Sequence, residues 1–231
     1  MLRGAYIISQ LIRSAAWFGI ITITAASITV PSYAQDPDDA LSVYAVSVVR
    51  TPPQSNGPLI SSGIYLGKGV IITAAHVVGP NPRVIIAGQE LSADVIKQGS
   101  FETTDLAVLS VDQTYLPVSL LLRRNPLCDE SPKAGDIVTV VVPGEMVRSR
   151  ITSLEGSNNF IEVSKVGDSG SGVFHQKGCL LGILNSKISD FYYRMDNGRM
   201  VRDLGMGSIE VAKHFVSAFE IANFIPPEFR F

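Results

Sequence analysis

Short apolar runs rich in β-branched residues, separated by turn residues, dominate the chain after residue 40. Val70–Thr73, Ile137–Val142 and Glu145–Leu154 are examples, and Gly67-Lys68-Gly69 marks a turn before the first of them. Short strands at regular spacing between turn signals are typical of all-β sandwiches and barrels. The pattern predicts further strands at residues 41–49, 62–66, 83–87, 91–96, 106–111, 160–163, 171–174 and 180–184.

The last part of the chain has a different hydrophobic period. Val211, Phe215 and Phe219 recur every four residues, and no glycine or proline interrupts residues 209–225. This spacing predicts an amphipathic helix over residues 209–225, ended by Pro226 and Pro227.

The first 34 residues have the pattern of a signal peptide. Arg3 and Arg13 precede an uncharged apolar stretch over residues 15–30, and Ser32-Tyr33-Ala34 supplies the small residues of a cleavage site. The alternative is a retained anchor, but the stretch is short for a spanning helix, which needs about 20 residues. We therefore expect a secreted or periplasmic protein without stable membrane association after cleavage.

The charge balance excludes some classes of function. The net charge is −2, and it becomes −4 without residues 1–34, because that segment holds two arginines and no acidic residue. No basic block of the kind that nucleic-acid binding requires is present. The three histidines, His76, His175 and His214, are far apart, and the cysteines lack a metal-binding spacing. We expect no nucleic acid, metal or cofactor.

The chain has two cysteines, Cys128 and Cys179. An even pair in a chain bound for an oxidising compartment can form one disulfide. The alternative is two unpaired buried thiols, since a free cysteine behaves as a small hydrophobe.

Candidate chemistry centres on Gly167-Asp168-Ser169-Gly170. A serine nucleophile needs a base and donors for the oxyanion, and glycines let a substrate carbonyl approach bare main chain. The alternative is an ordinary turn rich in glycine and serine. Two upstream segments change that balance: Ile72-Thr73-Ala74-Ala75-His76 and Asp105-Leu106-Ala107-Val108-Leu109.

These three motifs, in the order His, Asp, Ser, resemble the signatures of chymotrypsin-fold (trypsin-like) serine proteases. The resemblance covers most of residues 43–225. It implies two six-stranded antiparallel β-barrels, over about residues 41–115 and 132–208, followed by the C-terminal helix. The chain is also similar to the protease domain of bacterial HtrA-type proteases, but with 62 residues after Ser169 we do not expect the PDZ domain that usually follows it there.

The resemblance implies a triad in which His76 is the base, Asp105 orients it and Ser169 attacks. Glu102 and Asp112 flank Asp105, but neither opens an apolar run as the family pattern demands. The backbone N–H groups of Gly167 and Ser169 would form the oxyanion hole.

Substrate binding is also inferred from the resemblance. Val163, six residues before Ser169, falls at the base of the specificity pocket, where an apolar residue disfavours Arg and Lys. Asn185, Ser186 and Lys187 fall on the strand that pairs with the substrate backbone. We expect preference for small or medium apolar residues; acidic residues are the second choice, because Lys187 could attract them.

The expected function is a secreted serine endopeptidase that hydrolyses protein or peptide substrates through an acyl-enzyme. The alternative is a catalytically silent protein that keeps the fold and uses the cleft to bind peptides. An α/β-hydrolase esterase is disfavoured, because Ser171 stands where its motif requires glycine.

Overall fold

A computed structural model describes residues 40–51, 57–100, 103–154, 157–162, 169–191, 193–196, 199–202 and 208–230. The expected signal peptide and two predicted site residues, Val163 and Gly167, lie outside the described residues. In the described part of the chain, no helix has the length and apolar character needed to cross a bilayer.

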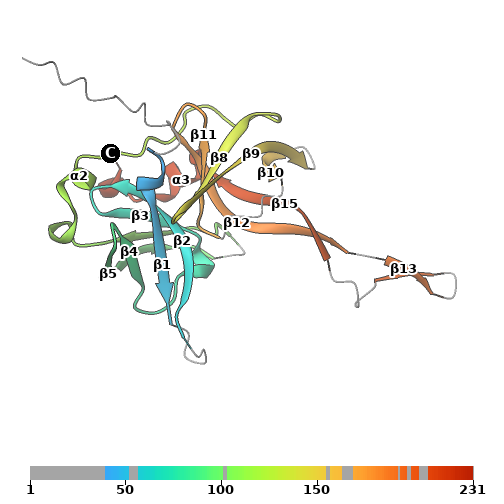
Figure 1. The fold of residues 1–231 in the computed structure, drawn as a ribbon, viewed down its shortest axis with the longest axis horizontal. Coiled ribbons are helices and arrows are strands. Elements are labelled where there is room, and N and C mark those ends of the chain that lie inside the picture. The colour runs from blue at the N-terminus through green and yellow to red at the C-terminus, as the bar shows by residue number, and fades with distance from the viewer. Residues whose placement is uncertain are drawn as a thin grey trace, which may run out of the picture. The chain divides into compact units, whose positions relative to one another are not determined.

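The first half of the fold is a curved antiparallel sheet, blue to green in Figure 1. Its strands, in the order β5-β4-β1-β2-β3-β7-β6, are β1 (Ala45–Arg50), β2 (Leu59–Gly67), β3 (Val70–Thr73), β4 (Arg83–Ile86), β5 (Gln89–Ser92), β6 (Asp94–Gln98) and β7 (Ala107–Ser110). The edge strands β5 and β6 are separated in sequence by Ala93 alone, which is buried. The two edges therefore meet at this residue, and one bent strand accounts for both.

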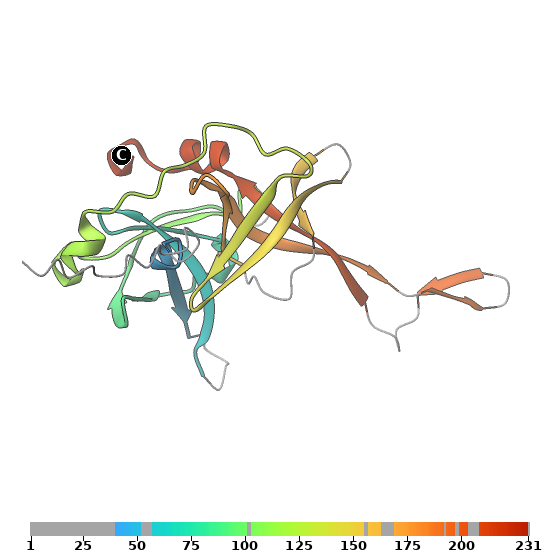
Figure 2. The same ribbon diagram turned by 45° about the horizontal axis from the view of Figure 1, so that its top comes forward.

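The second half is a closed antiparallel barrel. Its strands, in the order β10-β15-β12-β11-β8-β9, are β8 (Ile137–Val142), β9 (Glu145–Leu154), β10 (Ser157–Glu162), β11 (Gly172–His175), β12 (Leu180–Phe191) and β15 (Ser208–Ser217). A two-stranded sheet of β13 (Tyr193–Asp196) and β14 (Arg199–Arg202) lies beyond the far ends of β12 and β15 (Figures 1 and 2).

Short helical segments connect and follow the strands. They are η2 (Ser42–Tyr44), η3 (Ala75–Val77), η4 (Gln113–Tyr115), α2 (Val118–Leu121), α3 (Ala218–Phe224) and η5 (Pro227–Phe229). The predicted all-β double-barrel class with a C-terminal helix is confirmed. The first half matches the expected six strands if the bent strand at Ala93 is counted once.

A shared hydrophobic core joins the two halves. Ile64, Ile72 and Leu106 of the first half pack in one buried cluster with Phe174 and Ile183 of the barrel. Each of these side chains is withdrawn from water, and full burial of a large apolar side chain contributes about 1.5–3 kcal/mol. This core holds the ends of β3 and β7 in a fixed position against β11 and β12.

The predicted boundary of the C-terminal helix is wrong. Residues 208–217 form β15, and the helix α3 begins only at Ala218. Two neighbouring strands supply the hydrogen bonds of this segment, because β15 pairs with both β10 and β12. Tertiary pairing therefore overrides a spacing that also suits a helix. Ser217 and Glu220 form a capping box that marks the true start of the helix.

Cys128 and Cys179, 51 positions apart in sequence, form a disulfide with their Cα atoms 5.1 Å apart. The bridge ties the segment between the two halves to the turn between β11 and β12, where Cys128 N–H also donates to the Leu180 carbonyl at 2.9 Å. Of the two alternatives left open by the sequence, the bridged form is the one observed.

Replacing both cysteines with serine is expected to lower the free energy of unfolding by roughly 3–4 kcal/mol, because the bridge restricts the unfolded chain. Urea unfolding of the wild type and the Cys128→Ser/Cys179→Ser variant measures the difference. As a control, reductant should lower the wild-type midpoint to that of the variant and leave the variant unchanged. Equal midpoints under oxidising conditions would contradict the prediction.

Candidate active site

His76 stands where the chain leaves the first sheet. β3 ends at Thr73, and the following turn η3 carries the histidine between two buried neighbours, Ala75 and Val77. Ala74 is also fully buried, so a larger side chain would not fit there. The small residues let the turn pack closely, while the His76 side chain keeps about 35% of its surface exposed.

Asp105 fixes the orientation of the His76 ring. Its side chain is 2% exposed, and its Oδ2 lies 2.7 Å from His76 Nδ1. Its Oδ1 accepts a hydrogen bond of 3.0 Å from the His76 backbone N–H. Because both carboxylate oxygens bind the same residue, ring and backbone are held together, and Nδ1 is assigned as the proton donor to the carboxylate.

Two side chains from other strands of the first sheet hold the backbone of the His76 turn. Arg50 at the end of β1 donates from Nη1 to the His76 carbonyl at 2.9 Å. Gln98 at the end of β6 donates from Nε2 to the Ala75 carbonyl at 3.0 Å. The turn is thus anchored from both sides of the first sheet, and the imidazole needs little reorganisation before it acts.

Ser169 comes from the barrel, in the turn that precedes β11. Its carbonyl accepts from the Ser62 N–H at 3.3 Å, and the Gly170 N–H donates to the Leu184 carbonyl at 2.7 Å. The buried Thr73 hydroxyl in turn donates to the Ser62 carbonyl at 2.6 Å. The nucleophile turn is therefore held between β2 of the first half and β12 of the barrel.

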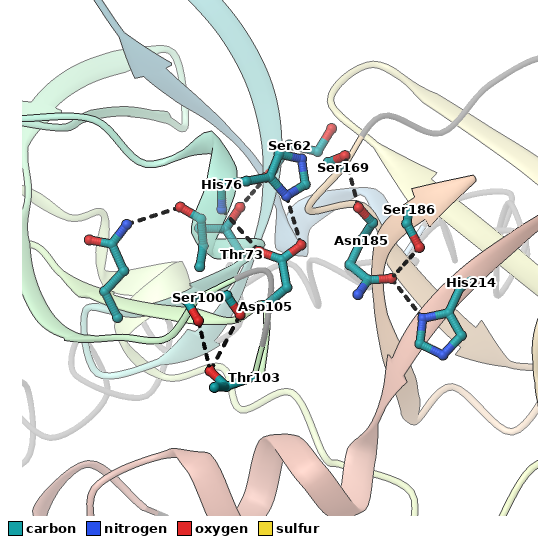
Figure 3. A network of polar contacts seen from close by, with 12 residues as sticks. Ser62, Thr73, His76, Ser100, Thr103, Asp105, Ser169, Asn185, Ser186 and His214 are labelled. Carbon is teal, nitrogen blue, oxygen red and sulfur yellow. Dashed lines mark hydrogen bonds and ion pairs between the residues drawn. The ribbon is translucent and has the colours of Figure 1, made fainter. Parts of the chain in front are cut away.

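The two halves bring His76 and Ser169 face to face (Figure 3). Asp105 lies on the other side of the imidazole, so the three residues predicted from the sequence lie in the order Asp, His, Ser in space. The Ser169 hydroxyl donates to the Asn185 carbonyl at 3.4 Å. An oriented imidazole beside a serine hydroxyl is the arrangement that nucleophilic catalysis requires.

The structure describes three of the four predicted substrate-binding residues, all in β12. Asn185 and Ser186 lie half-buried in β12, and the Asn185 carbonyl accepts from the Ser169 hydroxyl. Lys187 follows them in β12 and stands opposite Lys213 of β15 in the strand register. Val163 and Gly167 lie outside the described residues, and the base of the pocket, the oxyanion hole and the substrate contacts of the β12 residues all stay predictions.

Sequence reasoning missed three residues that contact the site. Ser62 and Thr73 support the Ser169 turn from the first half. His214, expected in a helix as a structural or exposed residue, lies in β15 and bonds the Asn185 side chain through Nδ1 at 2.8 Å. No local pattern marks these contacts, because each joins residues far apart in the chain.

Two surface cavities of about 460 and 350 Å³ flank the disulfide and share residues 128–131 of its loop. Neither is lined by His76, Asp105 or Ser169. These cavities are therefore separate from the arrangement that carries the candidate chemistry.

The sequence matches the trypsin-like peptidase domain family over residues 61–183, more than half of the 231-residue chain. The chain belongs to this family. The matched region contains His76, Asp105 and Ser169, and the family assigns the protein to the serine endopeptidases of the chymotrypsin fold. The predicted family and enzyme class are thus confirmed.

Solved structures show the same fold. This trypsin-like peptidase is similar to the active form of the Rv3671c protease from M. tuberculosis, with a TM-score of 0.58, 19% identity and 82% of each chain covered. It is also similar to a serine endoprotease from Yersinia pestis (TM-score 0.54, 21% identity, 81% of this chain and 62% of that chain). Kallikrein-related peptidase 10 gives a TM-score of 0.57 at 17% identity, with 82% and 96% covered. No curated protein matches the sequence.

Proposed function

We propose that the protein is a secreted serine endopeptidase that cleaves peptide bonds with a triad of His76, Asp105 and Ser169. The observation that carries the proposal is His76, whose ring and backbone N–H each bind one oxygen of the buried Asp105 carboxylate, with the imidazole facing Ser169 (Figure 3). Positioned base and hydroxyl together supply what a serine otherwise lacks as a nucleophile at neutral pH.

In the proposed reaction, Ser169 Oγ attacks the substrate carbonyl while His76 Nε2 takes the hydroxyl proton. The backbone N–H groups of Gly167 and Ser169 donate to the oxyanion that forms. His76 then gives the proton to the leaving amine, and the C–N bond breaks to leave an acyl-Ser169. Water, deprotonated by His76, attacks this ester, and the serine hydroxyl is restored as the acid leaves.

The proposal is tested by incubating the purified protein with a mixed peptide library and identifying new termini by mass spectrometry. We expect cleavage by the wild type and none above background by Ser169→Ala. Loss of only the hydroxyl should leave the fold intact, because the Ser62 and Leu184 contacts of this turn use backbone atoms. Equal cleavage by both proteins would contradict the proposal.

Cleavage after Arg or Lys is not expected to account for most of the new termini in that library. The family pattern sets Val163 at the base of the specificity pocket, and an apolar residue there offers no partner for a cation. The polar residues beside Ser169, Asn185 and Ser186, are neutral as well. A profile dominated by Arg or Lys would contradict this part of the proposal.

Secretion is proposed from the N-terminal pattern, and the disulfide supports it, because disulfides persist in oxidising compartments. Protein recovered from the periplasm or medium of a secreting host is expected to begin at Gln35. Intact mass and N-terminal sequencing measure this directly, with an Ala34→Arg variant as a control that blocks cleavage. Recovery of the full-length chain in the membrane fraction would contradict it.

A further inference from the structure

His214 is linked to Ser169 through one intervening residue, Asn185. Ser169 Oγ bonds the Asn185 backbone carbonyl, and the Asn185 side chain bonds His214. Ser186 Oγ also donates to Asn185 Oδ1, at 3.2 Å. With two donors at Oδ1, the amide of Asn185 is fixed in orientation, and Figure 3 shows this chain of contacts from Ser169 to the imidazole.

The strand register places the imidazole on the outer face of the barrel. His214 stands directly opposite Phe160 of β10 and Ser186 of β12, and paired residues share a face. The adjacent residues, Ile161 and Phe215, are fully buried in the barrel core. Since side chains alternate along a strand, Phe160 and His214 point away from that core, and the irregularity at Asn185, between Leu184 and Ser186, lets Ser186 lie on the same outer face.

This outer row is partly accessible, and its aromatic side chains contact each other. Phe160, Ser186 and His214 are each half-buried, and the Phe160 ring meets the imidazole edge-on with centroids 5.0 Å apart. Asn185 contacts both the Ser169 hydroxyl and the His214 imidazole, so a single residue separates this row from the atom that would carry the acyl group. A substrate acylated on Ser169 would therefore hold the side chain before the scissile bond within reach of the row.

The hydrogen bond of His214 to Asn185 determines which ring nitrogen can bind a ligand. Because Nδ1 donates to Asn185 Oδ1, the second nitrogen, Nε2, is the one left for a ligand. We propose that His214 is a specificity-determining residue that binds, through protonated Nε2, the carboxylate of Asp or Glu before the scissile bond. This inference rests on the proposed function, and it favours the second of the two preferences expected from the sequence.

The charges around His214 set its pH dependence. Burial lowers the pKa of the His214 imidazole below its ordinary value, and Glu220 of α3 partly opposes this. On the packed strands, the register places Glu162 of β10 two residues after Phe160, and it places Lys213 of β15, the residue before His214, opposite Lys187 of β12. In the free enzyme at neutral pH the imidazole is therefore mostly uncharged, and a bound carboxylate favours uptake of a proton.

The preference for acidic substrates should therefore become stronger as the pH falls. Acidic substrates bind the charged imidazole, so their kcat/KM relative to a leucine substrate should rise several-fold as the pH falls from about 8 to about 6. A glutamine substrate should not show the rise, because it carries no charge.

The experiment compares kcat/KM for peptides with Glu, Gln or Leu before the scissile bond in wild type, His214→Gln and His175→Gln. Gln at position 214 can still donate to Asn185 but cannot carry a charge. Losing a hydrogen bond to a charged group should lower the Glu-to-Leu ratio roughly 10–100-fold. The control His175 lies in β11, where its Nδ1 accepts from the Lys177 N–H, and its substitution should leave the ratio unchanged.

Labelling of Ser169 by a fluorophosphonate distinguishes failure of the His214 inference from failure of the proposed peptidase function. A labelled wild type that prefers Leu or Gln over Glu, or a Glu-to-Leu ratio unchanged in His214→Gln, would overturn this inference alone. A wild type that is neither labelled nor active would overturn the proposed function and this inference with it. Should His214→Gln fail to fold, the pH dependence of the wild-type ratio still decides, since a flat ratio overturns the role of His214.

Discussion

Asparagine in place of Asp105 is expected to lower kcat roughly 10³–10⁴-fold. One carboxylate oxygen accepts from the His76 backbone N–H and the other from Nδ1. In the variant the amide oxygen must take the backbone N–H, which turns the amide NH₂ toward Nδ1. Nδ1 then has to accept, the proton moves to Nε2, and the imidazole cannot take the proton of Ser169.

Asp112→Asn is the matched control for this prediction. Asp112 is an exposed N-cap that accepts from the Thr114 N–H and hydroxyl, and asparagine caps equally well. Its kcat should equal that of the wild type. Steady-state kinetics on one peptide, with circular dichroism to verify folding, measures all three proteins. A folded Asp105→Asn variant with wild-type kcat would show that Asp105 does not set the tautomer of His76.

Gly170→Ala is expected to lower the free energy of unfolding by roughly 2–5 kcal/mol and to abolish peptidase activity. Gly170 has a φ of +93°, and an added Cβ would overlap the Ser62 carbonyl oxygen and lie 2.5 Å from Thr73 Oγ1. The clash is with backbone, so it cannot be relieved by a side-chain rotation. The Ser169 turn must move away from β2, which also separates Ser169 from His76.

Gly144→Ala isolates the backbone part of that cost. Gly144, in the turn between β8 and β9, has a φ of +83° and open space around its added Cβ. It should lose only about 1–2 kcal/mol and keep full activity. Urea unfolding and peptide hydrolysis of the two variants provide the comparison. Equal stability losses in both would mean that the Ser62 carbonyl does not constrain the nucleophile turn.

Local patterns predicted most of the barrel strands. The bounds of β8 and β9 agree with the predicted ones, because both are continuous β-rich runs and Pro143-Gly144 marks the turn between them. The motifs around His76, Asp105 and Ser169 each end or begin at a strand, so their local positions were readable as well. Their approach in space depends on the packing between halves, which a pattern in one segment does not show.

The wrong start of the C-terminal helix and the missed contact of His214 have different physical causes. Residues 209–217 carry a spacing compatible with strand or helix, and their pairing with the long strand β12 decides between them. The capping pattern of Ser217 and Glu220 was the local signal for the true helix start. By contrast, the contact of His214 with Asn185 spans 29 residues and depends on strand register, so no motif could predict it.

Reaction of the purified protein with a fluorophosphonate probe tests the central claim, that Ser169 is an activated nucleophile. Such probes form a covalent bond with a serine only where base and oxyanion donors are assembled. We predict one adduct, located by mass spectrometry at Ser169, strongly reduced in Asp105→Asn and absent from Ser169→Ala. Folded wild-type protein that remains unlabelled, or an adduct at another serine, would contradict the account.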